Sequence, residues 1–144
     1  MTYSPWADAA ERYPDVLIHR CDLAPAQGAW VSSERVVLLD RALDARGRRC
    51  ALAHELVHMD RTHRPQGGWF GRRQELEADK IAAHRLLDDV EAIAEALCIH
   101  PLDPELVAEH LGVTVPVLRR RLSALTDAER DHIQARIDRE ERGA

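Results

Sequence analysis

The chain has 144 residues, of which 45% are hydrophobic and 4% aromatic, enough for one core of aliphatic and alanine side chains. Its 20 basic and 25 acidic residues give a formal net charge of −5 at pH 7. This balance argues against a general nucleic-acid-binding or anionic-membrane-binding protein, because both need an excess of positive charge.

Targeting signals are missing from the sequence. Its apolar stretches are far shorter than the roughly 20 residues of a membrane span, and residues 1–10 lack the charged-then-apolar order of a secretory signal. The three cysteines, Cys21, Cys50 and Cys98, form no even disulfide framework. We therefore expect a cytoplasmic protein with reduced cysteines and no membrane partner.

The chain begins with a helix and three short strands. Ser4 is placed as the N-cap of a helix that runs to Arg12. Apolar and β-branched runs predict strands at 16–21, 29–31 and 36–39. Short strands followed by helices indicate an α+β fold, in which a small antiparallel sheet of about three strands packs on the next helix.

That next helix, predicted from about Asp44 to Arg61, contains the motif H-E-x-x-H at His54, Glu55 and His58. One helical turn separates the two histidines, so both imidazole rings project from one face and can bind one metal ion. The carboxylate of Glu55 is then placed to take a proton from a water molecule at that metal.

A separate face of the same helix carries Leu52, Leu56 and Met59 at positions i, i+4 and i+7. This stripe predicts that the helix packs on the core while the histidine face stays free. The motif is short, and histidines on helices are often ordinary surface or core residues. A third ligand elsewhere in the chain is therefore needed to support a metal site.

Residues 62–71 contain one proline and three glycines, which predicts a loop after the motif helix. Trp69 and Phe70 are expected to attach this loop to the body of the protein, or alternatively to line a substrate groove. His63 is expected to be either a surface histidine or a hydrogen-bond donor to the transition state.

The third metal ligand is expected on the helix predicted from about Arg72 to Asp88. Glu75 and Glu77 are separated by about 200° of helical rotation, so both cannot face the metal. Glu75 lies on a face of small apolar residues and is the expected ligand, whereas Glu77 lies on a mostly polar face and is the alternative. Asp79, one turn after Glu75, is expected to accept a hydrogen bond from a ligand histidine and so fix its tautomer.

A helix is predicted at 90–99, and His100-Pro101 then breaks the pattern. We therefore divide the chain into a core of residues 1–100 and a helical segment of residues 101–144, which can also be integral to the same fold.

Residues 104–125 resemble a helix-turn-helix, with Arg119, Arg120 and Arg121 on the second helix. In a DNA-binding protein that helix would enter the major groove. Residues 101–144 contain seven arginines and nine acids, a net charge of −2, which opposes DNA binding. Structural or protein-docking use is expected, and DNA binding is the alternative.

Three segments together resemble the ImmA/IrrE family of zinc metallopeptidases. Residues 36–43 resemble the strand that this family has before its active-site helix, and residues 50–58 resemble that helix. Residues 75–83 resemble the family's glutamate helix, which has an E-x-E-A-(D/N)-x-x-A pattern. The three matches occur in the expected order and are far more specific than H-E-x-x-H alone.

The resemblance implies a Zn²⁺ enzyme whose substrate is another protein, typically a helix-turn-helix repressor that controls a mobile element or a stress response. The sequence departs from the usual pattern in three ways. Val57 stands where the family usually has glycine, Ile81 stands where phenylalanine is common, and no proline directly follows Leu86-Leu87. These changes affect packing and the substrate groove more than metal binding.

Two functions of different classes follow from these observations. The first is a zinc-dependent endopeptidase with His54, His58 and Glu75 as ligands and Glu55 as base. The second is a non-catalytic regulator that binds a protein or DNA through residues 101–144. The intact Glu55 favours the enzyme, because a structural zinc site needs no base. A toxin or antitoxin component overlaps both classes.

Overall fold

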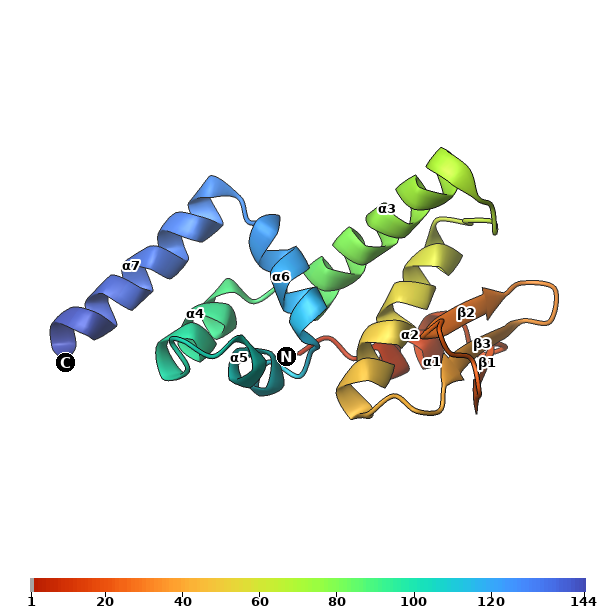
Figure 1. Cartoon of the computed structure of the whole chain (residues 1–144), viewed down its shortest axis with the longest axis horizontal. Coiled ribbons are helices and arrows are strands. Elements are labelled where there is room, and N and C mark those ends of the chain that lie inside the picture. Colours follow the sequence, from red (N-terminus) through yellow and green to blue (C-terminus); the bar gives the residue numbers. More distant parts are fainter. Residues whose placement is uncertain (1) are drawn as a thin grey trace.

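Seven helices and three strands make up residues 2–144, the part of the chain that the computed structural model describes. In chain order they are α1 (Pro5–Arg12), β1 (Leu17–Cys21), β2 (Gly28–Val31), β3 (Val36–Asp40), α2 (Ala45–Asp60), α3 (Gly68–Leu86), α4 (Val90–Ile99), α5 (Pro104–His110), α6 (Val115–Ser123) and α7 (Asp127–Gly143). The sheet and α1 lie at one end of the molecule and α7 lies at the other, with α2 and α3 between them (Figure 1). Among the described helices, none has both the length and the apolar character needed to cross a membrane.

The predicted α+β class with a three-stranded sheet is confirmed, but the sheet is mixed rather than antiparallel. The strand order is β1–β3–β2, and β2 and β3 form an antiparallel hairpin. β1 runs parallel to β3 because the chain crosses the end of β3 before it enters β2. Asp40 holds this crossing: its carboxylate accepts the N–H of Leu23 at 3.0 Å, and its own N–H donates to the carbonyl of Gln27 at 2.9 Å.

Helix α2 lies between two hydrophobic clusters. Its first turn is capped by Asp44, whose carboxylate accepts the N–H of Gly47 at 2.8 Å. The predicted stripe of Leu52, Leu56 and Met59 packs into the cluster that also contains β3. The opposite side of the helix enters a second cluster formed by helices. Packing on two sides fixes the rotation of α2 about its axis and therefore the direction of its histidines.

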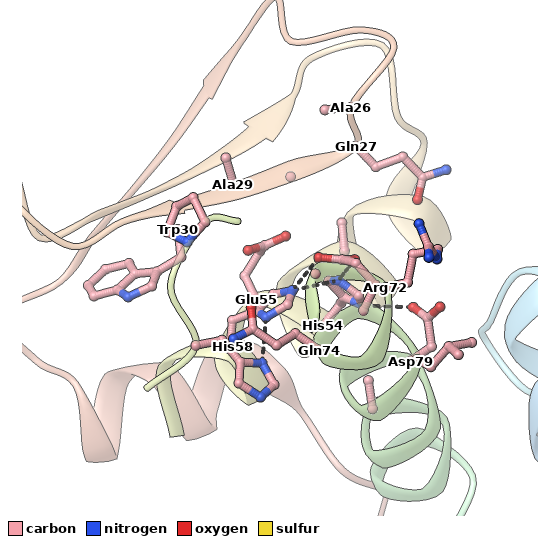
Figure 2. Close-up of a pocket in the computed structure, with 18 of the residues that line it drawn as sticks. Ala26, Gln27, Ala29, Trp30, His54, Glu55, His58, Arg72, Gln74 and Asp79 are labelled. Atoms are coloured by element: carbon pink, nitrogen blue, oxygen red, sulfur yellow. Dashed lines mark hydrogen bonds and ion pairs between the residues drawn. The ribbon is translucent and has the colours of Figure 1, made fainter. Parts of the chain in front are cut away.

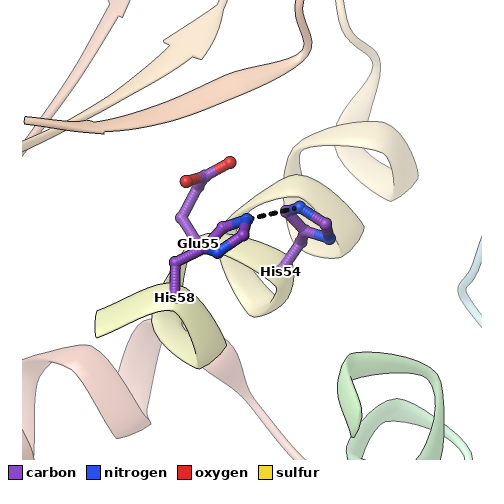
Figure 3. Close-up of side chains that lie close together, drawn as sticks. All are labelled: His54, Glu55 and His58. Carbon is purple, nitrogen blue, oxygen red and sulfur yellow. Dashed lines mark hydrogen bonds between the residues drawn. The ribbon is translucent and has the colours of Figure 1, made fainter. Parts of the chain in front are cut away.

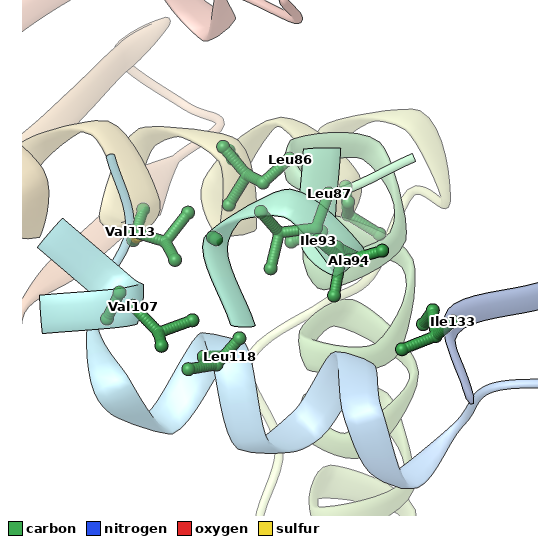
Figure 4. Packing of buried hydrophobic residues seen from close by; sticks show 14 of the residues in the cluster. Leu86, Leu87, Ile93, Ala94, Val107, Val113, Leu118 and Ile133 are labelled. Atoms are coloured by element: carbon green, nitrogen blue, oxygen red, sulfur yellow. The ribbon is translucent and has the colours of Figure 1, made fainter. Parts of the chain in front are cut away.

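The second cluster is built by helices from both halves of the chain (Figure 4). Leu86, Ile93, Val107, Leu118 and Ile133 all belong to it, and each is at most 6% exposed. These residues come from both sides of the boundary predicted near residue 100. Helices α5, α6 and α7 therefore share one core with α2, α3 and α4.

The three arginines of α6 have different surroundings. Arg121 is 1% exposed, and its guanidinium donates to the carbonyl of Leu87 at 2.7 Å and to the carboxylate of Glu129 at 2.6 Å. Arg119 and Arg120 are exposed. Arg121 therefore joins α6 to its neighbours and is too buried to contact a nucleic-acid phosphate, which weakens the DNA-binding alternative.

Helix α3 begins four residues earlier than predicted. Trp69 and Phe70 lie in its first turn, where they are 55% and 64% exposed, so the expectation that they attach the loop to the body is wrong. Their rings contact each other, with centroids 4.9 Å apart. The chain folds so tightly before α3 that a Cβ at Gly71 would lie 2.1 Å from the carbonyl oxygen of Gln66. The loop can take this path because Gly71 has no Cβ and allows the close approach of Gln66. Packing of the two aromatic rings on the body of the protein does not determine it.

Candidate metal centre

Helices α2 and α3 bring His54, His58 and Glu75 together. The Nε2 atoms of the two histidines are 3.0 Å apart, and each lies 3.0 Å from a different oxygen of the Glu75 carboxylate. Ala53 of α2 and Ala78 of α3 are fully buried in the shared cluster, and such small side chains let the two helices approach closely. The structure thus places Glu75 where the sequence-based hypothesis needs the third ligand.

Asp79 fixes the orientation of His54 (Figure 2). Its Oδ1 lies 2.9 Å from Nδ1 of His54. Because a carboxylate accepts hydrogen bonds, Nδ1 carries the proton when the ring is neutral, and the lone pair of Nε2 points toward His58 and Glu75. This is the contact that the spacing of the acids predicts for Asp79.

Glu77, the alternative ligand, contacts His63 and Arg61 instead of the motif histidines. Its Oε1 lies 3.3 Å from Nε2 of His63 and 3.5 Å from Nε of Arg61. The side chain of His63 is 11% exposed, and its Nδ1 lies 2.9 Å from Nδ1 of His58. The contact was not foreseen, because His63 reaches α2 from a loop and belongs to no helical spacing.

Glu55 is buried between α2 and the sheet and points toward β2 (Figure 3). A Cβ at Gly28 of β2 would lie 3.1 Å from Oε1 of Glu55, so glycine leaves room for the carboxylate. Burial raises the pKa of Glu55 to about 7. The positive charge of His54 partly opposes this rise, and the negative charge of Glu75 adds a smaller rise. A carboxyl group with this pKa can accept and release a proton near neutral pH.

The two histidines have opposite pKa shifts. Burial disfavours the charged form of His54, but hydrogen bonds to Asp79 and Glu75 outweigh it and raise the pKa of this ring to about 10. Burial, followed by the positive charge on His54, lowers the pKa of His58. The carboxylates of Asp79 and Glu75 therefore favour a positive charge on His54 rather than on His58.

The donor set fits a tetrahedrally coordinated divalent cation. Ligand atoms at about 2.0–2.1 Å from zinc are about 3.3 Å from one another, close to the 3.0 Å separations of the two Nε2 atoms and the Glu75 oxygens. His54, Glu55 and His58 also offer ligand atoms that all lie within 4.8 Å of one another. The two histidines and Glu75 can therefore hold the ion, and the carboxylate of Glu55 lies close to both histidines.

A cleft of about 1190 Å³ opens over these residues. Strand β2 forms one wall and the loop before α3 forms another. Helix α6 adds a third wall through Pro116, Val117 and Arg120, and a guanidinium nitrogen of Arg120 lies 4.0 Å from Oδ2 of Asp79. The sequence did not predict this wall, because it depends on contacts between residues far apart in the chain, such as Arg120 and Asp79.

A model of the Peptidase M78 family, described as an IrrE N-terminal-like domain, matches residues 11–123. The chain belongs to this family. The match confirms the ImmA/IrrE resemblance and extends from the end of α1 to the end of α6, so it includes every residue of the centre. Members of Peptidase M78 are metal-dependent peptidases, in keeping with the His54–Glu55–His58 group. No curated protein and no solved structure matches this Peptidase M78 chain.

Proposed function

We propose that this protein is a zinc-dependent endopeptidase that cleaves another protein. The observation that carries the proposal is the convergence of two imidazole nitrogens and one carboxylate, with Glu55 beside them. Nitrogen and oxygen ligands suit zinc, and three protein ligands leave a fourth position for water or substrate, as in catalytic sites. A structural site would close that position with a fourth side chain.

The side chains of the centre have distinct roles in this proposal. Bound zinc supplies the Lewis acidity that polarises a peptide carbonyl and lowers the pKa of a water molecule toward about 7. His54, His58 and Glu75 hold the ion. The carboxylate of Glu55 accepts the proton of the attacking water and then donates it to the nitrogen that leaves the cleaved peptide bond.

Strand β2 is suited to bind an extended segment of the substrate. The strand order makes β2 an edge of the sheet, and Gly28, Ala29 and Trp30 line the cleft (Figure 2). An edge strand has unpaired backbone N–H and C=O groups that can bond to an added strand. A substrate held this way passes over Glu55, which lies directly beneath Gly28.

The identity of the substrate rests on the family resemblance. A helix-turn-helix repressor that controls a mobile element or a stress response is the protein substrate that we propose. Comparing new protein N-termini in cells that contain the wild-type protein or an inactive variant would identify the substrate by its cut site.

The variant Glu55→Gln tests the mechanism. It keeps the size of the side chain but removes the base, so we expect zinc content to stay at that of the wild type and cleavage to fall by at least about 100-fold. Glu34→Gln, at an exposed position in the β2–β3 turn, is the matched control and should cleave normally. Undiminished cleavage by Glu55→Gln would refute the mechanism.

The same experiment separates the enzyme from a non-catalytic regulator. A regulator that binds a protein or DNA through residues 101–144 would act equally well with Glu55→Gln. It would instead depend on Arg119 and Arg120, the two exposed arginines of α6. Arg119→Ala combined with Arg120→Ala should then abolish its binding.

A further inference from the structure

His63 returns to α2 immediately after that helix ends. Thr62 has a positive φ of 52°, and the N–H of His63 donates to the carbonyl of His58 at 3.0 Å. The backbone turn thus brings the ring of His63 against the ring of His58, with centroids 5.1 Å apart. The backbone hydrogen bond between His63 and His58 therefore holds the two rings together at the end of α2.

The contacts of this cluster have one consistent arrangement of protons. The negative charge of Glu77, 3.3 Å from Nε2 of His63, favours the tautomer of His63 that carries its proton on this nitrogen. Nδ1 of a neutral His63 is then a hydrogen-bond acceptor, and it can accept only from Nδ1–H of His58, 2.9 Å away. His58 is thereby held in the tautomer whose Nε2 lone pair faces His54 and Glu75.

Two acids of α3 therefore act on two ligand histidines of α2. Asp79 bonds directly to Nδ1 of His54 at 2.9 Å, and Glu77 reaches Nδ1 of His58 through the ring of His63. Metal-binding histidines commonly need such a partner, because it fixes both the tautomer and the direction of the ring. Without His63, the ring of His58 would lack this partner.

We infer that His63 is a positioning residue that orients His58 for metal binding, and that Glu77 acts through His63. The inference rests on the proposed metal centre and deepens it. It assigns to Glu77 a role other than the ligand role that its spacing also allows. It also assigns the loop histidine to ligand orientation rather than to donation of a hydrogen bond to the substrate.

Zinc affinity, measured by competition with a chromophoric chelator, tests the inference without any substrate. We expect His63→Ala to weaken zinc binding by about 10- to 100-fold and His63→Gln, which keeps a hydrogen-bond acceptor, to restore part of the loss. Glu77→Ala should cause a smaller loss. His84→Ala and Glu95→Ala change exposed residues of the same types and should bind zinc normally.

A double-mutant cycle distinguishes action through His63 from an independent effect. In the His63→Ala background, Glu77→Ala should cause no further loss of zinc affinity. An equal loss in both backgrounds would show that Glu77 acts by another route, such as its contact with Arg61 at 3.5 Å. That result would overturn the second part of the inference.

The proton on Nδ1 of His58 provides a spectroscopic signature that a general packing role would not produce. In zinc-loaded wild-type protein, ¹⁵N-resolved NMR should show a slowly exchanging Nδ1–H on His58, and His63→Ala should lose it. Wild-type zinc affinity and an unchanged His58 signal in His63→Ala would overturn the inference but leave the proposed enzyme intact. If the wild-type protein bound no zinc, the proposed function itself would fail.

Discussion

His54 must lose a proton before it can bind a metal ion, because its neighbours favour the charged ring. Hydrogen bonds to Asp79 and Glu75 outweigh burial and hold its pKa near about 10. The protonated ring is therefore the favoured form near neutral pH. His58 contributes little to the proton count there, because its pKa is shifted below the usual value.

We therefore expect zinc to displace the His54 proton when it binds. Between about pH 7.5 and about pH 8.5, where Glu55 is already mostly ionised, the apparent zinc affinity should rise about tenfold for each pH unit. Below about pH 7 the slope should be steeper, because zinc also displaces a proton from Glu55. Chelator competition at several pH values measures the slope. Asp79→Asn removes a charge that raises the pKa of His54 and should make the slope shallower. A wild-type affinity that does not change over this range would contradict the prediction.

Gly28 is a second residue whose effect can be measured separately from metal binding. In Gly28→Ala the new Cβ would lie 3.1 Å from Oε1 and Cγ of Glu55, so the carboxylate has to move. We expect kcat/KM to fall by about 10- to 100-fold with zinc content unchanged, because a small displacement of a catalytic group has a large effect on rate.

Gly143→Ala is the control for Gly28→Ala. Gly143 is exposed at the end of α7, far from the cleft residues, and a Cβ there would have open space around it. This variant should keep the activity of the wild type. If Gly28→Ala cleaves as fast as Gly143→Ala, the space that Gly28 leaves for Glu55 has no catalytic importance.

At the scale of elements, the ion pair of Arg121 and Glu129 joins α6 to α7. Arg121 is buried, so its charge needs a partner, and a carboxylate oxygen of Glu129 lies 2.6 Å away. Glu129 also completes a capping box with Thr126 at the start of α7. The hydrogen bond from Arg121, followed by the backbone N–H of Thr126, lowers the pKa of Glu129 to about 2.

Because folding lowers the pKa of Glu129, the free energy of unfolding depends on pH in the acid range. The ionised form of Glu129 is favoured by folding, so its contribution is complete above about pH 4.5 and is lost as the pH falls toward about 2. We expect Glu129→Gln to lower the free energy of unfolding at pH 7 by about 1 kcal/mol, after allowance for solvent screening of the pair. The difference from the wild type should vanish near pH 2. Chemical denaturation at several pH values measures it.

Asp131→Asn is the control for this prediction. Asp131 is exposed on the same helix, so its removal should leave stability nearly unchanged at both pH values. A loss of stability in Glu129→Gln that is the same at pH 7 and near pH 2 would show that the ionised Glu129–Arg121 pair is not responsible.

The sequence predicted the helices better than their arrangement. Positions along one helix follow a fixed rotation per residue, so the common face of His54 and His58 and the different directions of Glu75 and Glu77 were foreseeable. The pairing of β1 with β3 and the place of α6 beside the cleft were not foreseeable. These features depend on contacts between segments far apart in the chain, such as Arg120 with Asp79.

At the scale of the whole molecule, the helical core is continuous across residue 100. Ile93 of α4 lies in the same cluster as Val107 of α5, Leu118 of α6 and Ile133 of α7. Removal of the last three helices would expose apolar side chains on α3 and α4 that are buried in the intact chain. Helix α6 also closes one side of the cleft over the metal centre.

We therefore expect a fragment of residues 1–100 to lose cooperative thermal unfolding, because its remaining helices lack a complete core. A fragment of residues 1–140, which lacks only exposed residues at the end of α7, should unfold like the intact protein. Circular dichroism and calorimetry measure both. A sharp unfolding transition for residues 1–100 would instead support an independent metallopeptidase core.

The two-sided attachment of α2 connects the two halves of the cleft. Leu52 and Leu56 hold this helix to the sheet, whereas Ala53 and Val57 hold it to α3. A polypeptide bound along β2 would therefore rest on the same helix that carries the imidazoles. A substrate that shifted the sheet would also change the distance between these imidazoles and Glu75.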